Sequence, residues 1–406
     1  MSELVGRPAY LDWLQRWRDH DLIKVVTGVR RCGKSTLLQQ FAGGLRDEVG
    51  PEHVIQINLE DPAYRDLLDD PYRLYDHVVG QLNPGDHAYV ILDEVQRVRD
   101  FQKAADGLFV HPQIDLYLTG SNAWLLSGEL ATLLSGRYVE LGMLPYSFAE
   151  WWTAQPDATD LARDRLLIEY LGSGGFPYTV RLDGDASAIN EYLLGVVATV
   201  MIKDVMSRRE VRDVPVFDRV VTYLADNIGN LTSPKGIADA LTSGGRKTSQ
   251  MTVEGYLTGL TDAYLLYPAK RFDVRGKRLL SRVEKYYFVD PGLRGALLGG
   301  VSRDQGRLLE NVVFLELLRR GLAPNVGVME GSEIDFVTAG RTGAQYIQVA
   351  ASVRDPATLA RELAPLRAAP GHYARLLLTL DPGRFDHDGI TQINVADWLL
   401  DTAPSH

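Results

Sequence analysis

The sequence predicts an α/β protein of several domains that begins with a parallel sheet covered by helices. Two observations predict this class. The chain has 406 residues, which is more than one ordinary hydrophobic core holds. Strand-like apolar runs alternate with helical patterns as far as about residue 145, as in parallel sheets with helical crossovers. The content of 45% hydrophobic and 24% charged residues is typical of soluble globular proteins.

The expected elements follow from changes in the hydrophobic period. Five strands are expected in the first third, at residues 22–27, 54–59, 89–92, 116–119 and 138–142. Short helical patterns with polar turns, then the alternating segment 264–289, predict a winged helix-turn-helix. The alternating helix and strand patterns after about residue 301 predict a further α/β domain. The predicted parts are the sheet domain 1–145, a helical lid or connector 146–212, the winged helix 213–298 and the last domain 299–406.

A glycine-rich segment after the first expected strand matches the phosphate-loop pattern GxxxxGK[ST]. A helical pattern follows it directly, which is the context that the motif requires. The glycines let consecutive backbone N–H groups converge on a phosphate chain at a helix N-terminus. An ordinary glycine-rich turn is the alternative. The candidate nucleotide-binding residues of this segment are Gly28, Arg30, Arg31, Cys32, Gly33, Lys34, Ser35 and Thr36.

Two acidic residues, Asp93 and Glu94, end the third expected strand. Parallel sheets of this class bind ligands at the carboxyl edge of their strands. In a phosphate-loop enzyme, Lys34 would reach the β and γ phosphates, and Ser35 and Asp93 would be Mg²⁺ ligands. Glu94 would orient and polarise the attacking water. Acidic pairs also end many solvent-exposed strands, but after a phosphate loop the pair favours phosphate-chain hydrolysis.

These two motifs, together with the segment 118–122, resemble those of AAA+ ATPases. More specifically, the chain resembles prokaryotic ATP-binding proteins in which an AAA+ domain is followed by a winged helix and a PD-(D/E)xK nuclease-like domain. The resemblance implies ATP and Mg²⁺ as ligands and a restriction-endonuclease-like fold for the last domain. It implies a polar sensor, in which Ser121 or Asn122 would hydrogen-bond the γ-phosphate or the water. The same two residues would also suit a helix N-cap.

The resemblance implies roles for two arginines. Arg137 occupies the place from which AAA+ enzymes present an arginine finger to a neighbouring subunit, and such a guanidinium stabilises charge in the transition state. A surface arginine closing a helix is the alternative. Arg7, in Val5-Gly6-Arg7, resembles a motif that lies against adenine in origin-recognition-type and STAND ATPases. A finger acting in trans implies a homo-oligomer, such as a ring or hexamer.

The expected winged helix is the basic part of an acidic chain. Between residues 215 and 290 there are eleven Lys and Arg against eight acids, whereas the whole chain has a net charge of −10. We expect contacts to the backbone phosphates of double-stranded or branched DNA. Docking on an acidic protein surface is the alternative. The candidate DNA-binding residues are Arg246, Lys247, Lys270, Arg271, Arg275, Lys277, Arg278 and Arg282.

The last domain resembles PD-(D/E)xK nucleases but has no lysine in the motif. Asp335 lies on the expected second strand, and Glu310 resembles an accessory acid in the first helix. The third strand has Gln348 and then Ala350 where the motif has lysine. Because alanine carries no charge and cannot donate a proton, we expect the domain not to cleave DNA. We expect Asp335 and Glu310 to be remnants of the fold or weak metal ligands. Any other α/β domain could also give this order of elements.

The sequence thus predicts a cytoplasmic Mg-dependent AAA+ ATPase that couples ATP binding and hydrolysis to DNA binding or remodelling. The single cysteine fits a reducing compartment. The sequence has no uninterrupted run of eighteen apolar residues, so we expect no insertion into a membrane. Two other functions fit the same motifs. One is a STAND-like switch that docks a protein partner without moving along DNA, and the other is a DNA-binding module that holds ATP as a structural ligand.

Overall fold

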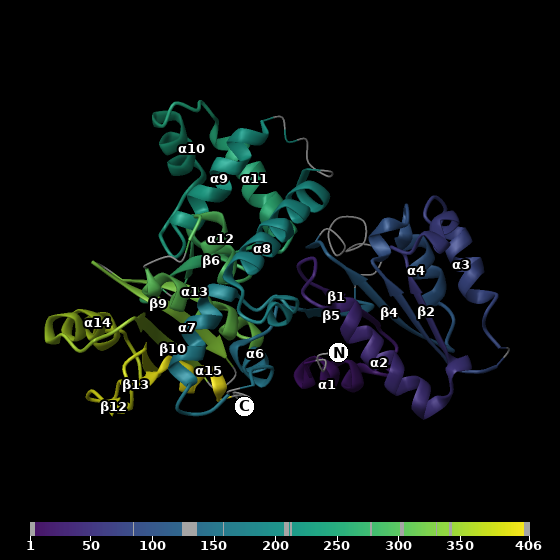
Figure 1. Cartoon of the computed structure of the whole chain (residues 1–406), viewed down its shortest axis with the longest axis horizontal. Helices are drawn as coiled ribbons and strands as arrows, with labels where there is room; N and C mark the ends of the chain where they lie inside the picture. The colour runs from purple at the N-terminus through teal and green to yellow at the C-terminus, as the bar shows by residue number, and fades with distance from the viewer. Residues whose placement is uncertain are drawn as a thin grey trace. The chain divides into compact units, whose positions relative to one another are not determined.

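The computed structural model describes residues 5–401, apart from 84, 124–135, 157, 207–210, 212, 277, 301–303, 330 and 341–342. The chain divides into two compact units. The N-terminal unit comprises Gly6–Met143 with Asp262–Tyr264, and the C-terminal unit comprises Met1–Val5, Leu144–Thr261 and Leu265–His406. Each unit has its own sheet (Figure 1).

The sheet of the N-terminal unit is parallel throughout, with the strand order β2-β3-β4-β1-β5. This confirms the predicted fold class of the first third, and all five expected strands are present. Buried residues, most of them apolar, form the three inner strands β3, β4 and β1, which explains why the sequence showed these strands as nearly continuous apolar runs. The strands are β1 Ile23–Thr27, β2 Val54–Asn58, β3 Ala88–Asp93, β4 Ile114–Gly120 and β5 Tyr138–Gly142.

Helices cover both faces of this sheet (Figure 1). On one face, side chains of α3 and α4 pack on alternate strand residues such as Val25 and Leu92. On the other face lies α2, where the Phe41 ring is 5.1 Å from that of Tyr117. The helices of this unit are α1 Pro8–Trp17, α2 Lys34–Val49, α3 Pro71–Val79 and α4 Phe101–Phe109, with short 3-10 turns at Pro51–His53, Pro62–Leu67 and Val95–Arg97.

Helices form most of the first part of the C-terminal unit. The expected helical segment and the three short helices before the hairpin are present. Their arrangement as a lid and a winged helix remains a prediction. They are α6 Phe148–Thr153, α7 Arg163–Ser173, α8 Ala186–Val200, the π-helical turn Met201–Met206, α9 Val214–Asp226, α10 Pro234–Ser243, α11 Gln250–Asp262, α12 Gly292–Leu297 and, further on, α13 Gln305–Arg319, α14 Pro356–Ala368 and α15 Val395–Leu400.

One sheet joins the predicted hairpin to the last hundred residues. Its strand order is β12-β13-β11-β10-β9-β8-β6-β7. Strand β6 pairs with β7 in the expected hairpin and also with β8, so the hairpin is an edge of this larger sheet rather than a free wing. The strands are β6 Leu266–Asp273, β7 Arg278–Phe288, β8 Asn325–Met329, β9 Ser332–Gly340, β10 Gly343–Ala350, β11 Ala374–Thr379, β12 Arg384–Asp386 and β13 Thr391–Asn394.

A buried carboxylate, Asp290, fixes the glycine-rich turn after α7. It accepts hydrogen bonds from the backbone N–H of Gly175 at 2.6 Å and of Gly292 at 2.9 Å. Burial raises the pKa of Asp290 to about 7, although these N–H groups and Arg319 act in the opposite direction. Gly174 has φ +71° and a Cβ there would lie 2.0 Å from Asp290, so this turn requires glycine.

One helical stretch in the described part of the chain, Ala186–Met206, is long and apolar enough to span a membrane by length and composition. Its mean hydropathy is 1.2, and a third of its apolar window is buried within the protein. Core helices of soluble proteins have the same properties, so this stretch is weak support for a membrane span.

Candidate functional site

The phosphate-loop motif forms the tight turn between β1 and α2. Gly28 has φ +141° and Gly33 has φ +105°, which are conformations that favour glycine. A Cβ at Gly28 would lie 2.1 Å from the backbone oxygen of Met143, so the backbone approach also excludes a side chain. The turn therefore has the shape that the sequence predicted, with α2 beginning at Lys34.

The side chain of Lys34 folds back over the turn. Its Nζ donates to the backbone oxygen of Gly28 at 2.9 Å and of Val29 at 3.3 Å. It also lies 3.7 Å from Oε1 of Glu94, and both side chains are more than nine-tenths buried. The predicted phosphate-binding lysine and the predicted water-orienting carboxylate are thus direct neighbours.

Strand β4 lies between β1 and β3 and connects the two predicted motifs. Its Thr119 is fully buried and donates its hydroxyl to Oδ1 of Asp93 at 2.5 Å. The same hydroxyl accepts the backbone N–H of Glu94 at 2.8 Å. Burial raises the pKa of Asp93, whereas the hydroxyls of Ser35 and Thr119 act against this rise. Ser35 and Asp93, the predicted Mg²⁺ ligands, therefore interact directly.

The carboxylate of Glu94 is held on both of its oxygens. Oε1 faces Lys34, and Oε2 accepts from Nε2 of Gln96 at 2.5 Å and from the Ser121 hydroxyl at 3.2 Å. Burial alone would raise the pKa of Glu94, but Lys34 and Arg30 with these donors lower it below the usual value. The carboxylate is therefore ionised at neutral pH. Ser121, the predicted sensor, thus belongs to this network, and its role toward a nucleotide remains a prediction.

The remaining predicted nucleotide residues surround the turn. Arg7 is buried, and its guanidinium donates to the backbone oxygen of Cys32 at 3.2 Å, so it stabilises the loop through its backbone. Burial raises the pKa of the Cys32 thiol, which makes it an unreactive core group. Arg30 pairs with Glu60 at 2.9 Å. Asn122 is buried beside Ser121, Arg31 is exposed with φ +69°, and Thr36 is half-buried in the first turn of α2.

Arg137 lies at the other end of the sheet from the loop. Its backbone oxygen accepts the N–H of Ile23, the first residue of β1, whereas the loop follows the last residue of that strand. Five residues of strand separate the two ends by about 16 Å. The guanidinium pairs with Asp106 at 2.8 Å and is half exposed. Arg137 therefore cannot serve the site of its own chain.

Four of the predicted DNA-binding residues are exposed basic side chains in the described structure, namely Arg246, Lys247, Lys270 and Arg275. Arg271 is half-buried. Lys277 and the side chains of Arg278 and Arg282 lie outside the described residues. One further base of the same segment, Lys285, is 3% exposed and contacts acidic side chains, so it does not contribute to a basic surface.

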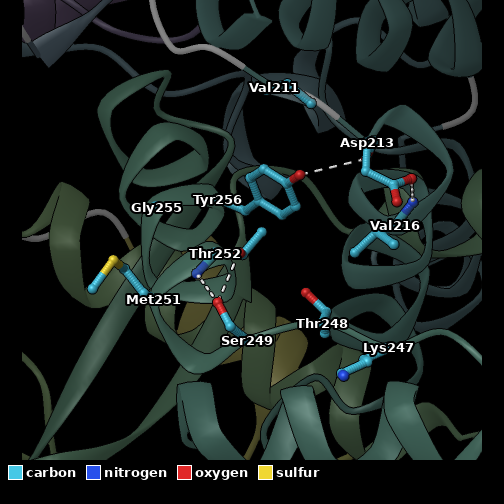
Figure 2. A pocket seen from close by; sticks show the side chains of 10 residues that line it. All are labelled: Val211, Asp213, Val216, Lys247, Thr248, Ser249, Met251, Thr252, Gly255 and Tyr256. Carbon is cyan, nitrogen blue, oxygen red and sulfur yellow. Dashed lines mark hydrogen bonds between the residues drawn. The ribbon is translucent and has the colours of Figure 1, made fainter.

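A cavity of about 710 Å³ lies beside the amino end of α11. Figure 2 shows the Tyr256 hydroxyl pointing to the backbone oxygen of Asp213, a contact of 3.4 Å. Ser249 caps the helix by accepting the N–H of Thr252 at 3.1 Å. Lys247 lines the same cavity. Two of the predicted DNA contacts, Lys247 and its neighbour Arg246, thus lie at the start of this helix.

A protein of Haemophilus influenzae, described as uncharacterized, is 37% identical to this chain over 406 residues. The match covers 98% of this chain and 99% of that protein. This chain belongs to the same family. A second relative, an uncharacterized protein of Methanocaldococcus jannaschii, is 29% identical over 343 residues, which are 80% of this chain and 74% of the relative.

Two family models match parts of the chain. Residues 20–152 match an AAA domain, which confirms the AAA part of the resemblance. Residues 164–304 match a domain of unknown function (DUF8612). This second match spans both the expected lid and the expected winged helix, so it supports neither assignment by itself.

The solved structures that resemble the chain include Aeropyrum pernix ORC1 in complex with DNA. That match has 14% identity and a TM-score of 0.34, and it covers 74% of this chain and 94% of ORC1. AMPPCP-bound DnaA from Aquifex aeolicus matches with 14% identity and a TM-score of 0.31, covering 64% of this chain and 89% of DnaA. TM-scores this low carry no argument about function.

Two residues of the site were not predicted from the sequence. Thr119 lies within the segment 118–122, and its position at the end of β4, next to β3, is the signal that could have identified it. Gln96 follows Glu94 by two residues, but its approach to Glu94 depends on the 3-10 turn Val95–Arg97, which the sequence pattern did not indicate.

Thr119→Val is expected to destabilise the N-terminal unit by about 1–3 kcal/mol, because the change leaves the buried N–H of Glu94 without its acceptor and removes one of the donors to the Asp93 carboxylate. Urea unfolding monitored by circular dichroism measures the change. Thr119→Ser keeps the hydroxyl and serves as the control. Equal stability of the valine variant and the parent would contradict this role of Thr119.

Proposed function

We propose that this protein is a cytoplasmic Mg-dependent AAA+ ATPase that couples ATP binding and hydrolysis to DNA binding. One observation carries the proposal: the loop lysine, the acidic pair, Thr119 of β4 and Ser121 just after it meet at the carboxyl edge of the sheet in an AAA domain. This is where parallel α/β sheets bind their ligands. The backbone turn Gly28–Ser35 would bind the phosphate chain.

The residues around Asp93 fit a Mg²⁺ ion. A carboxylate and a hydroxyl already interact here, and hard cations prefer such oxygen donors. Ser35 and Asp93 would hold the ion, and Thr119 fixes the orientation of Asp93. When bound, Mg²⁺ supplies positive charge to the phosphate oxygens.

Nucleotide binding would change the contact between Lys34 and Glu94. In the present structure Lys34 donates to loop carbonyls and faces Glu94. A phosphate chain in the turn would draw Lys34 toward itself, because a phosphate carries more negative charge than one carboxylate. Glu94 would then keep Gln96 and Ser121 as partners on Oε2 and have Oε1 available to orient a water.

The position of Arg137 supports a role in a neighbouring site. It lies at the amino edge of the sheet and is half exposed, and its guanidinium pairs with Asp106 of the same chain. We propose that it reaches the nucleotide of an adjacent subunit in a homo-oligomer. There it would stabilise charge in the transition state.

The exposed bases at the start of α11 and on the hairpin support DNA binding in the C-terminal unit. Arg246 and Lys247 precede α11, and Lys270 and Arg275 belong to the hairpin region. Contacts of this kind would be made mainly to backbone phosphates, so the affinity should fall steeply with salt. The nucleotide state would control how this surface is presented.

Glu94→Gln is expected to reduce ATP turnover roughly 100-fold or more while nucleotide binding persists, because the amide cannot accept a proton from water. Phosphate release measures turnover, and equilibrium dialysis measures binding. Glu52→Gln, an exposed glutamate of the same unit, is the control and should behave like the parent. Unchanged turnover in Glu94→Gln would exclude this residue as the base.

Arg137→Ala is expected to lose turnover, and mixing it with Glu94→Gln should restore part of the activity. In a mixed oligomer some sites combine an intact Glu94 with an intact Arg137 from the neighbour. Asp106→Asn, which breaks only the ion pair within the chain, should stay active. If the mixture is no more active than its two components, the arginine does not act between subunits.

Replacing Arg246 and Lys247 together by Ala should weaken binding of a short DNA duplex at low salt and make the remaining binding less salt-dependent. Filter binding over a salt series measures both effects. Arg367→Ala, an exposed arginine of α14, is the control. Equal retention of DNA by the double variant and the parent would favour the docking of a protein partner.

A further inference from the structure

A buried lysine contacts Glu310 and Asp335, the two acidic residues that the nuclease resemblance identified, and also Glu333. Nζ of Lys285 is 2.8 Å from Oε1 of Glu310, 2.9 Å from Oε1 of Glu333 and 3.5 Å from Oδ1 of Asp335. The lysine comes from β7 and the acids come from α13 and β9. The motif lacks its lysine at Ala350, but an ammonium group from another strand is present in the cluster.

Other groups hold the carboxylates in place around this ammonium. The Tyr287 hydroxyl donates to Oε1 of Glu310 at 2.6 Å, and the N–H of Val349 donates to Oδ2 of Asp335 at 2.9 Å. Tyr287 follows Lys285 by two residues, so both lie on the same face of β7. Oε1 of Glu310 and both oxygens of Asp335 therefore already accept from donors of the protein.

The charges of the cluster support a bound ammonium. Burial alone would lower the pKa of Lys285, but Glu310, Asp335 and Glu333 together raise it above its usual value, so the lysine stays charged. Burial and then Glu310 raise the pKa of Asp335 to about 7, against the effect of Lys285. The Lys285 ammonium thus offsets part of the negative charge of the three carboxylates that it contacts.

A divalent ion does not fit this arrangement. Mg²⁺ requires oxygen ligands at about 2.0–2.1 Å in octahedral geometry. An ion bound to Glu310 and Asp335 would lie within a few ångströms of the Lys285 ammonium, and the two cations would repel each other in a buried site. In a metal-dependent nuclease, the lysine that assists the metal-bound water lies beside the ion. Here the Lys285 ammonium instead contacts Glu310 and Asp335, the carboxylates that would have to bind the ion.

We propose that the Lys285 ammonium permanently replaces a divalent metal ion in this carboxylate cluster, so that an internal cation holds this part of the C-terminal unit together and the cluster takes no metal. Lys285 joins the hairpin to α13 and β9 through these contacts. The cluster is therefore a structural cross-link and not a nuclease centre. This inference does not depend on ATP hydrolysis.

Titration of the full chain with Mn²⁺ in the absence of nucleotide, followed by electron paramagnetic resonance of the free ion, tests the proposal. The parent and Asp335→Asn are expected to give the same binding curve. Lys285→Met removes the charge but keeps most of the stem, and it should gain one Mn²⁺ site. Adding Asp335→Asn to Lys285→Met should abolish that site. Mn²⁺ should also raise the thermal midpoint of Lys285→Met by more than that of the parent, which shares the Asp93 site but not the new one.

Lys235→Met, which removes an exposed lysine of α10, is the matched control and should gain no site. Mn²⁺ binding by the parent that Asp335→Asn abolishes would overturn the proposal, and so would a folded Lys285→Met protein that gains no Mn²⁺ site. The comparison of the parent with Asp335→Asn remains decisive if Lys285→Met does not fold.

Discussion

The structure of the N-terminal unit depends on one geometric constraint, which is that parallel strands end at the same edge of a sheet. Because β4 lies between β1 and β3, Thr119 can contact Asp93 and the backbone of Glu94 at the same time. The same order brings Lys34, at the start of the helix that follows β1, within 3.7 Å of Glu94. Residues nearly ninety positions apart thus form one polar network.

Both units use lysine to neutralise buried carboxylates, but with different consequences. Lys34 contacts one carboxylate and two neutral backbone oxygens. Because only one of these partners is charged, a phosphate can replace them and draw the lysine to itself. Lys285 faces three carboxylates, which no neutral ligand can replace. A lysine with few charged partners suits a site that exchanges ligands, whereas a lysine with several suits a permanent cross-link.

The N-terminal sheet could be predicted well from the sequence because its inner strands β1, β3 and β4 are buried on both faces. Such strands are continuous apolar runs, and the glycines and acids at their ends are required by the turn and by the sheet edge. The phosphate loop and the acidic pair could therefore be assigned from the sequence alone. Gln96 could not, because its contact with Glu94 depends on a single short turn.

Lys285 shows where reasoning from the sequence fails. The sequence places it among the bases of the hairpin, and a strand pattern alone does not tell which of its two faces is covered. Helix α13, which begins twenty residues later, covers the face with Lys285 and Tyr287. Only the tertiary pairing therefore separates this base from the exposed ones, and the same pairing joins the hairpin to the larger sheet.

The central claim is that Lys34 and the acidic pair form a nucleotide site, and calorimetric titration of the parent and of Lys34→Ala with ATP and Mg²⁺ tests it most directly. The parent should release or absorb heat with a single saturable site per chain, and folded Lys34→Ala should show none. An absence of heat for the parent, or equal binding by the variant, would contradict the claim.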